Sequence, residues 1–233
     1  MNLSEQKQKG FTIVELLVVI VVIGILASIS IVTYKGVQKR AAYTAAISDV
    51  SKATEIVESF EALQHTFPTS IEGCPTPGEN EVCLKASNGG TWLYDAVKSS
   101  AAEPDVVIAS INNRQFSLAT IGGMEDSDEF IRVFNLAPII DKYGLVKYQL
   151  DFDIKSADSS VDNTTQAYMQ NGSGAKYSFY QNFNVTDSYE HKSTTFTPTL
   201  SNSSLQDSYL AFYGTYSTGN RPIVKNVKMS LAQ

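Results

Sequence analysis

Apolar residues are distributed unevenly along this chain. One continuous apolar run extends from Phe11 to about Tyr34, and Glu15 is the charged residue within it. As a helix rising about 1.5 Å per residue, the run would span roughly 36 Å, enough to cross the hydrocarbon core of a membrane. The pattern therefore predicts a membrane-spanning helix over residues 11–34.

Beyond this run, apolar residues recur at intervals close to the helical period. They are Ala41, Ala45, Val50, Ala53, Val57, Phe60 and Leu63. Acidic residues on the intervening positions indicate a solvent-exposed face. Pro68 disfavours helix in the residue before it. We therefore expect one helix over residues 11–66, apolar on all sides at first and amphipathic in residues 35–66.

Residues 67–104 are expected to form a loop and a linker. Cys74 and Cys83 lie in the loop, and an isolated even pair in an exported protein indicates a disulfide, with two free thiols as the alternative. Trp92, the single Trp, is either a core residue or a ligand platform. The stretch 99–104 has the composition of a linker, which places a domain boundary near residue 105.

From residue 105 onward, short runs typical of strands are separated by Gly, Asn, Asp and Ser. The clearest run, residues 148–155, alternates apolar residues with Gln149, Asp151, Asp153 and Lys155. About eight or nine such runs predict an antiparallel β-sandwich over residues 105–233. We expect the segment from about residue 111 to fold alone. The predicted fold class is α+β.

Composition limits the function classes. The chain has 18 basic and 24 acidic residues, and its net charge of −6 disfavours broad binding to nucleic acid. His65 and His191 lie far apart, and neither lies near a Cys at metal-ligand spacing, so we expect no metal site built from them. We also expect no resident cofactor.

No catalytic motif stands out, so we expect a protein that is not an enzyme. The sequence has neither a Gly-x-Ser-x-Gly elbow nor a phosphate-binding Gly-rich loop. Asp151 and Asp153 would suit acid–base chemistry, but solvated charges on a strand are the alternative. The acidic stretch 125–129 would offer oxygen ligands to calcium, and a solvated acidic loop is again the alternative.

Residues 9–17 read Lys-Gly-Phe-Thr-Ile-Val-Glu-Leu-Leu. This resembles the prepilin signature of type IV pilins and type II secretion pseudopilins. The resemblance implies that residues 1–10 are a leader, that a prepilin peptidase cleaves between Gly10 and Phe11, and that Phe11 is then N-methylated. It also implies that Glu15 neutralises the amino terminus of a neighbouring subunit during assembly. The alternative for Glu15 is a carboxylate that simply lies at the membrane interface.

The same resemblance implies partners and a location. The chain would sit in the inner membrane with its leader in the cytoplasm, and would then self-assemble into a helical filament through a pilus assembly platform. An extracellular type IV pilus is the expected product. A subunit of the filament body, a tip adhesin, and a pseudopilin of a type II secretion or competence system all remain open. Many pilins carry a Pro within this helix, and residues 11–66 contain none.

A second resemblance concerns the predicted sandwich. The runs 148–156, 175–179, 194–198, 209–214 and 223–228 are similar to a carbohydrate-binding module of the jelly-roll, galactose-binding-like kind. This implies binding of polysaccharide, and the segment is rich in Tyr, whose rings stack on sugars while amides hold hydroxyls. Tyr half-buried at sandwich edges is the alternative. Lys225 replaces an Asp usual in that family, where calcium would bind. The candidate glycan-binding residues are Gln166, Tyr168, Gln170 and Tyr180.

Overall fold

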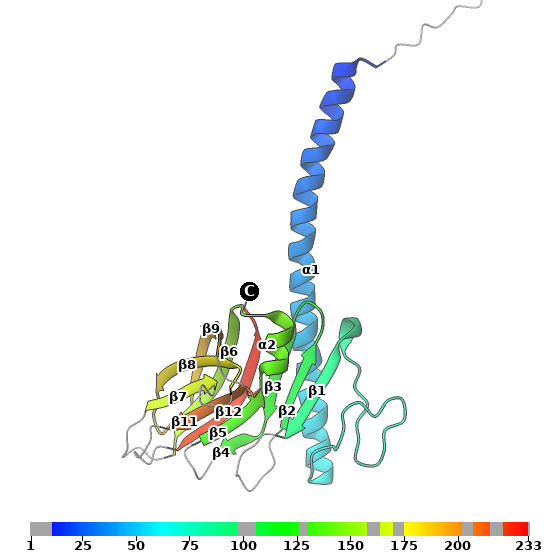
Figure 1. Ribbon diagram of the computed structural model, residues 1–233. Coiled ribbons are helices and arrows are strands. Elements are labelled where there is room, and N and C mark those ends of the chain that lie inside the picture. The colour runs from blue at the N-terminus through cyan, green and yellow to red at the C-terminus, as the bar shows by residue number, and fades with distance from the viewer. Residues whose placement is uncertain are drawn as a thin grey trace, which may run out of the picture. The chain divides into compact units, whose positions relative to one another are not determined.

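The structure is a computed structural model that describes residues 11–96, 106–125, 130–157, 164–169, 175–201, 207–214 and 221–232 (Figure 1). The chain divides into two compact units, Met1–Ala41 and Ala42–Gln233. Helix α1 (Ile13–Gln64) begins in the first unit and ends in the second. The expected long N-terminal helix is therefore confirmed, although it ends at Gln64 rather than at residue 66.

The first unit contains the apolar part of α1, whose described side chains are exposed from Phe11 to Tyr34. Within the described residues, α1 is the helix long and apolar enough to cross a membrane. The hydroxyls of Ser28, Ser30 and Thr33 each donate a hydrogen bond to the carbonyl one turn earlier, at 2.7, 2.8 and 3.0 Å. The polar groups on this stretch are thus bonded within the helix itself, which suits a hydrocarbon environment.

In the second unit, one stripe of α1 is buried, and it differs in part from the predicted one. Its apolar members are Ala42, Ala46, Val50, Ala53 and Val57. Ala41 and Leu63 were expected on this face, but both are exposed, Leu63 at 78%. At about 100° per residue, Leu63 lies roughly 120° round the helix from Val57, so it leaves the buried stripe.

Two antiparallel sheets make up the predicted sandwich. The seven-stranded sheet has the order β1-β2-β3-β12-β6-β9, with β4 also paired to β12, and the five-stranded sheet has the order β10-β8-β7-β11-β5. The first sheet comprises β1 (Thr91–Ala96), β2 (Val106–Ile111), β3 (Phe116–Ile121), β4 (Gly123–Glu125), β6 (Tyr148–Ser156), β9 (Glu190–Phe196) and β12 (Pro222–Leu231). The second comprises β5 (Phe130–Asn135), β7 (Thr164–Met169), β8 (Tyr177–Asn184), β10 (Thr199–Leu200) and β11 (Tyr209–Gly214).

Two apolar cores organise the second unit. The larger lies between the sheets and includes Tyr148, Phe152 and Phe212. The smaller joins α1 to β1, β2 and β3 through residues such as Val57, Trp92 and Ile108. Every residue of β2 and β3 is buried, because the sandwich interior covers one face and α1 covers the other. By contrast, β6 alternates buried and half-buried residues as predicted.

The position of β1 changes the expected domain organisation. Along its whole length β1 pairs with β2, from Thr91 opposite Ile111 to Ala96 opposite Val106. Residues 91–96 therefore belong to the sheet that we expected to begin at residue 105, and the predicted linker, residues 99–104, lies outside the described residues. A segment starting near residue 111 would lack β1 and nearly all of β2. The compact unit begins at Ala42 instead, and independent folding of the shorter segment stays a prediction.

Trp92 is a core residue. Its side chain is 7% exposed and packs in the smaller core with α1. Its indole Nε1 is buried and has no hydrogen-bond partner among the described residues. The core interpretation of Trp92 is confirmed, and the ligand-platform alternative is excluded by its burial.

The short helix α2 (Ala137–Tyr143) was missed by the sequence analysis, which predicted strands alone after residue 105. Residues typical of helix boundaries are present at both ends of α2. Pro138 lies in its first turn, and Gly144, at φ 85°, follows its last turn. The helix buries Ile139 and Ile140 against the larger core. With seven residues, α2 is too short for its periodicity to be evident.

The predicted disulfide between Cys74 and Cys83 is present. It closes a loop whose backbone is bonded across the same region, with Gly73 N donating to Val82 O at 3.1 Å and Leu84 N to Ile71 O at 2.8 Å. Ile71 is 1% exposed and packs in the smaller core. The disulfide therefore braces a loop that is anchored against α1 and the sheet.

Candidate functional site

The start of α1 is capped by its own first carboxylate. Glu15 Oε2 accepts hydrogen bonds from Thr12 N at 2.8 Å and from Thr12 Oγ1 at 2.9 Å. In return, Glu15 N donates to Thr12 Oγ1 at 3.2 Å. This reciprocal arrangement is a capping box. It directs the carboxylate toward the N-terminal end of the helix, beside Phe11, while Gly10 lies outside the described residues.

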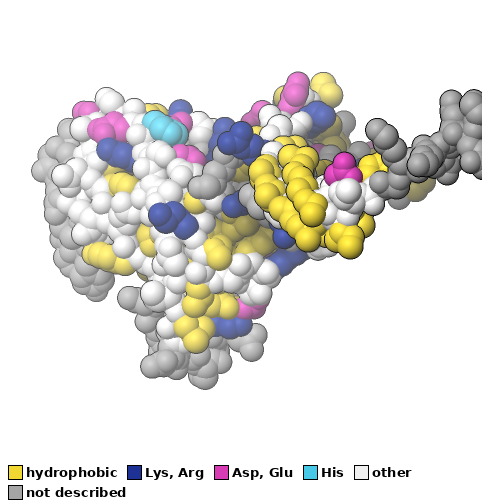
Figure 2. All heavy atoms as spheres, turned by 90° about the horizontal axis from the view of Figure 1, so that it is seen from above, with side chains coloured by type: hydrophobic (Ala, Val, Ile, Leu, Met, Phe, Trp, Pro, Cys, Tyr) yellow, Lys and Arg dark blue, Asp and Glu magenta, His cyan; other side chains and the backbone are white. Residues whose placement is uncertain are grey.

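Around Glu15 the helix surface is apolar, as Figure 2 shows by the yellow side chains on the part of α1 in view. The exposed apolar residues extend from Phe11, at 91%, to Val37, at 59%. A surface of this kind is unfavourable in water and needs either lipid or other apolar helices around it. A single carboxylate on it would be costly in lipid without a partner, and the Thr12 bonds reduce that cost.

A second candidate site lies on the outward face of the five-stranded sheet. We define the tyrosine face as the outward-facing side chains Gln166 and Tyr168 of β7, Tyr180 and Asn182 of β8, and Tyr213 of β11. The strand register places Tyr168 opposite Tyr180, and Gln166 between Asn182 and Tyr213. Alternation of side chains along paired strands is what gathers these residues on one surface.

Specific contacts order the tyrosine face. Gln166 Nε2 donates a hydrogen bond to Tyr180 Oη at 2.9 Å. The rings of Tyr168 and Tyr213 lie edge to face, with centroids 6.4 Å apart. Tyr180 is 57% exposed, so a large part of its ring faces solvent. The face thus presents one open ring beside two half-buried ones.

The five side chains of the tyrosine face are uncharged, and the nearby charge that acts on Tyr168 is the guanidinium of Arg132 on β5, the strand next to β11. Burial raises the pKa of Tyr168 to about 12, so its hydroxyl keeps its proton at neutral pH. Among the described residues of β7, β8 and β11, no outward-facing side chain is charged. Aromatic rings flanked by amides and hydroxyls can stack on a sugar ring and exchange hydrogen bonds with its hydroxyls.

The structure brings together three of the four residues predicted for glycan binding: Gln166, Tyr168 and Tyr180. Gln170 lies outside the described residues. Asn182 was not predicted, and Tyr213 was noted only as one of many tyrosines. Both reach the site through strand pairing, and the adjacency of β11 to β7 joins segments more than 40 residues apart. No local sequence signal identifies such a neighbour.

The two carboxylates of β6 do not act together. Asp153 accepts a hydrogen bond from Asn226 Nδ2 at 2.7 Å and bonds with His191 Nδ1 at 2.9 Å, which holds the pKa of Asp153 below its usual range. Asp151 accepts from Gln149 Nε2 at 3.0 Å. Each carboxylate thus has partners of its own on a wet sheet face, which favours the solvated-charge interpretation.

The described residues add no support for calcium binding at Lys225 or at the acidic stretch 125–129. Lys225, at the place where the resembling family has Asp, lies with its Nζ 3.9 Å from the centroid of the Tyr189 ring. The acidic stretch expected as a calcium loop falls at residues 126–129, outside the described residues, and the side chain of Glu125 is not described.

Residues 6–31 match the family model of the prokaryotic N-terminal methylation motif. The chain carries a prepilin-type methylation motif. Type II secretion system core protein G of Escherichia coli (strain K12) is 36% identical over 70 residues, which is 30% of this chain and 48% of that protein. A fimbrial protein of Pseudomonas aeruginosa is 46% identical over 52 residues, 22% of this chain and 34% of that protein.

Type II secretion system core protein G of Aeromonas hydrophila is 31% identical over 71 residues, which is 30% of this chain and 50% of that protein. The chain thus spans half or less of the length of these curated relatives. Its prepilin-type N-terminal part is homologous to both secretion and fimbrial proteins, as the sequence resemblance implied.

Matches among solved structures are to carbohydrate-binding modules. One is a family 29 module complexed with mannohexaose, at TM-score 0.30 and 14% identity, covering 63% of this chain and 84% of that one. Another is a family 22 xylan-binding domain from Paenibacillus barcinonensis, at TM-score 0.31 and 15% identity, covering 63% and 88%. TM-scores of this size carry no argument about what this chain binds.

Proposed function

We propose that this chain is a subunit of a type IV pilus that polymerises through α1 and displays the sandwich on the cell surface. The observation that carries the proposal is the methylation motif of residues 6–31, followed by a helix whose apolar surface is exposed from Phe11 to Val37. Such a surface would lie in the inner membrane before assembly and among other copies of α1 in the filament. The proposed role is structural and adhesive, not enzymatic.

Assembly would follow from the chemistry at the start of the helix. A prepilin peptidase would cleave between Gly10 and Phe11, which removes the leader and creates a new amine at Phe11. Glu15 of a neighbouring copy carries the opposite charge. In a low-dielectric surrounding, this pairing is worth far more than in water, and it would bring an incoming subunit into register on the assembly platform.

Mass spectrometry of filaments sheared from cells tests this proposal. We expect the N-terminal peptide to begin at Phe11 and to carry one added methyl group. A Gly10→Val variant serves as the control, and it should remain uncleaved in the membrane fraction. If sheared filaments yield a peptide that still contains Lys9 and Gly10, the proposal is contradicted.

A pseudopilin of a type II secretion system is the second candidate. Its support is the longer match to secretion core protein G, over 70 residues against 52 for the fimbrial protein. Deleting the chain distinguishes the two roles. Loss of surface filaments or attachment with normal exoprotein release favours the pilus, whereas loss of exoprotein release with filaments retained favours the pseudopilin.

For the displayed sandwich, we propose weak polysaccharide binding by the tyrosine face. The support is the set of uncharged side chains Gln166, Tyr168, Tyr180, Asn182 and Tyr213, gathered on one surface. Stacking on a ring contributes about 1 kcal/mol, so a single site would bind in the high micromolar to millimolar range. Many copies on one filament would raise the avidity by orders of magnitude.

Titration of the full chain in detergent micelles with neutral polysaccharides checks this binding. Tyr180→Leu should weaken it several-fold. Tyr189→Leu is a matched control, because Tyr189 is also a partly exposed Tyr, at 41% against 57%, but belongs to the segment before β9 of the other sheet. Equal affinity in the Tyr180 variant, or equal loss in both variants, would rule out the tyrosine face as the site.

A further inference from the structure

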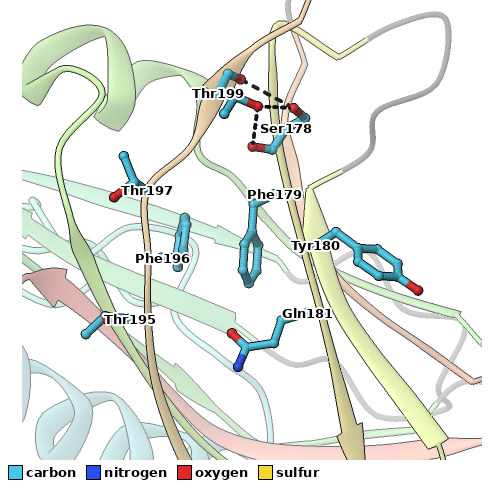
Figure 3. A pocket seen from close by; sticks show the side chains of 8 residues that line it. All are labelled: Ser178, Phe179, Tyr180, Gln181, Thr195, Phe196, Thr197 and Thr199. Atoms are coloured by element: carbon cyan, nitrogen blue, oxygen red, sulfur yellow. Dashed lines mark hydrogen bonds between the residues drawn. The ribbon is translucent and has the colours of Figure 1, made fainter.

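A cleft opens at one edge of the sandwich, between β8 and the chain that runs from β9 into β10 (Figure 3). Its volume is about 390 Å³. It is lined by residues of both sheets: Ser178, Phe179, Tyr180, Gln181, Thr195, Phe196, Thr197 and Thr199. A volume of this size lies within the usual range for sites that hold small ligands.

Two stacked aromatic rings form the apolar part of the cleft. The Phe179 and Phe196 rings have centroids 4.1 Å apart and planes inclined by 25°. In Figure 3 both rings point into the space between the two strands, whereas Tyr180 points away from it toward the tyrosine face. Phe196 is buried and Phe179 is half-buried, so the pair is anchored in the core and still reaches the cleft.

Hydrogen bonds fix the width of the cleft near both of its ends. At one end, Thr194 Oγ1 donates to Gln181 Oε1 at 2.7 Å. At the other, the hydroxyls of Ser178 and Thr199 bond at 2.6 Å. Each bond joins β8 to the facing chain. A cleft held in this way is preorganised, so a ligand would lose little affinity to ordering its walls.

The cleft is uncharged, and it retains hydrogen-bonding capacity. No residue that lines it is acidic or basic. The bond from Thr194 engages the amide oxygen of Gln181 and orients its Nε2, which has no partner among the described residues. An ionic ligand would lose hydration here without meeting a counter-charge, whereas a neutral hydroxylated ligand could accept from Nε2.

From this combination we propose that the cleft is a second sugar-binding site for an uncharged mono- or disaccharide unit, distinct from the tyrosine face although Tyr180 belongs to both. The CH face of the sugar packs against the Phe179 side of the ring pair, and Gln181 Nε2 donates to a sugar hydroxyl. The inference rests on Phe179 and Gln181 and not on the ring of Tyr180, so it is tested separately from polysaccharide binding by the tyrosine face.

An extended peptide that pairs with the open strand edges would be a different occupant. The edge strand β9 argues against it. Lys192 Nζ and Glu190 Oε2 form an ion pair at 2.6 Å, on the same side of β9 as Phe196. Charged side chains at this place on an edge strand disfavour the addition of another strand.

Saturation-transfer NMR on the full chain in a detergent without sugar groups tests the proposal. The probes are cellobiose, maltose and mannobiose, with digalacturonic acid as the charged comparison and a hexavaline peptide as the strand comparison. We expect at least one neutral disaccharide to bind saturably with a millimolar Kd. Digalacturonic acid and the peptide should give no saturable signal.

Gln181→Glu is the decisive variant. The carboxylate still accepts the bond from Thr194, so the fold is retained, but the Nε2 donors are lost. We expect the disaccharide Kd to rise about tenfold or more, a change equivalent to about 1.4 kcal/mol. Tyr168→Leu is the matched control on the tyrosine face, and it should leave the disaccharide Kd within about twofold while weakening polysaccharide binding.

The proposal is overturned if no neutral disaccharide binds, if the hexavaline peptide binds in their place, or if folded Gln181→Glu binds as the unmodified chain does. Where Gln181→Glu fails to fold, Thr199→Val replaces it, since Thr199 is exposed and its loss releases Ser178 at the other end of the cleft. An unchanged Kd in the Thr199 variant then overturns the proposal, and a Kd raised about threefold supports it.

Discussion

Asp49 on α1 accepts a hydrogen bond from the backbone N–H of Ser87 at 2.7 Å. The Ser87 hydroxyl donates to the same carboxylate at 2.6 Å, and the hydroxyl of Ser110 on β2 at 3.3 Å. Ser87 begins the short 3-10 turn η1 (Ser87–Gly89). Although it is a charged residue, Asp49 is 8% exposed and lies in the buried stripe of the helix. One carboxylate thus connects the helix, the turn before β1 and the sheet.

Asp49→Ala should lower the free energy of unfolding by about 1–3 kcal/mol, because it leaves the buried hydroxyl of Ser110 and the two donors of Ser87 without their acceptor. Urea unfolding of the full chain in detergent measures the change. Ser51→Ala, an exposed position on the same helix, is the control and should shift the free energy by less than about 0.5 kcal/mol. Equal midpoints for the two variants would show that the carboxylate has no such role.

Removing the disulfide should destabilise the second unit moderately. The bridge spans nine positions, and in the chain-entropy model a loop this short contributes about 2–3 kcal/mol. We expect the Cys74→Ser, Cys83→Ser double variant to unfold at lower urea concentration by this amount. Reducing agent should reproduce the shift in the unmodified chain and leave the variant unaffected; a response of the variant to reductant would contradict the assignment.

Glu15→Leu should enter the membrane but assemble poorly. The substitution makes the helix more apolar, so insertion is retained, while the carboxylate that would pair with an incoming Phe11 amine is lost. We expect filament yield to fall by about tenfold or more with the membrane pool unchanged, as measured by comparing the two fractions.

Thr12→Val separates assembly from helix capping, because it removes the hydroxyl that bonds to Glu15 and keeps the carboxylate. If the carboxylate acts mainly on a neighbouring subunit, this variant should assemble better than Glu15→Leu. Equal losses in the two variants would instead assign Glu15 a capping role alone.

Asp153 should contribute stability that depends on pH. Its bonds from Asn226 and His191 hold its pKa below the unfolded value of about 3.9. The contribution of Asp153 to the free energy of unfolding is therefore fully present above the unfolded-state pKa. It is lost as the pH falls through the lower pKa of the folded state. Asp153→Asn should cost about 0.5–1 kcal/mol at pH 7 and progressively less as the pH drops below 4. A deficit that stays constant from pH 7 to pH 2.5 would contradict this.

Elements defined by local pattern were predictable from the sequence. The apolar run of α1 and the alternation on β6 are both local signals, and each of the predicted runs after residue 105 corresponds to a strand. Contacts between distant segments were not predictable. No local pattern marks the role of Asp49, because its partners Ser87 and Ser110 lie 38 and 61 residues away.

The tyrosine face was predicted in part for the same reason. Gln166 and Tyr168 are neighbours in sequence on one side of β7, so they were chosen together. Tyr213 joins them only because β11 pairs with β7. The edge cleft escaped notice altogether, since Gln181 and Thr194 belong to different sheets and meet across the sandwich.

The place of β12 sets the order in which this unit can fold. It lies between β3 and β6, although it is the last of the described strands in sequence. Until residues 222–231 have been synthesised, β3 and β6 lack the strand that pairs with both of them. Leu118 and Leu150 then lack Met229, which lies opposite each of them in the strand register and packs in the same core. Pairing over so long a separation is slow. We therefore expect the sheet to close late, after the whole unit has been synthesised, so the incomplete unit would pass through an aggregation-prone stage.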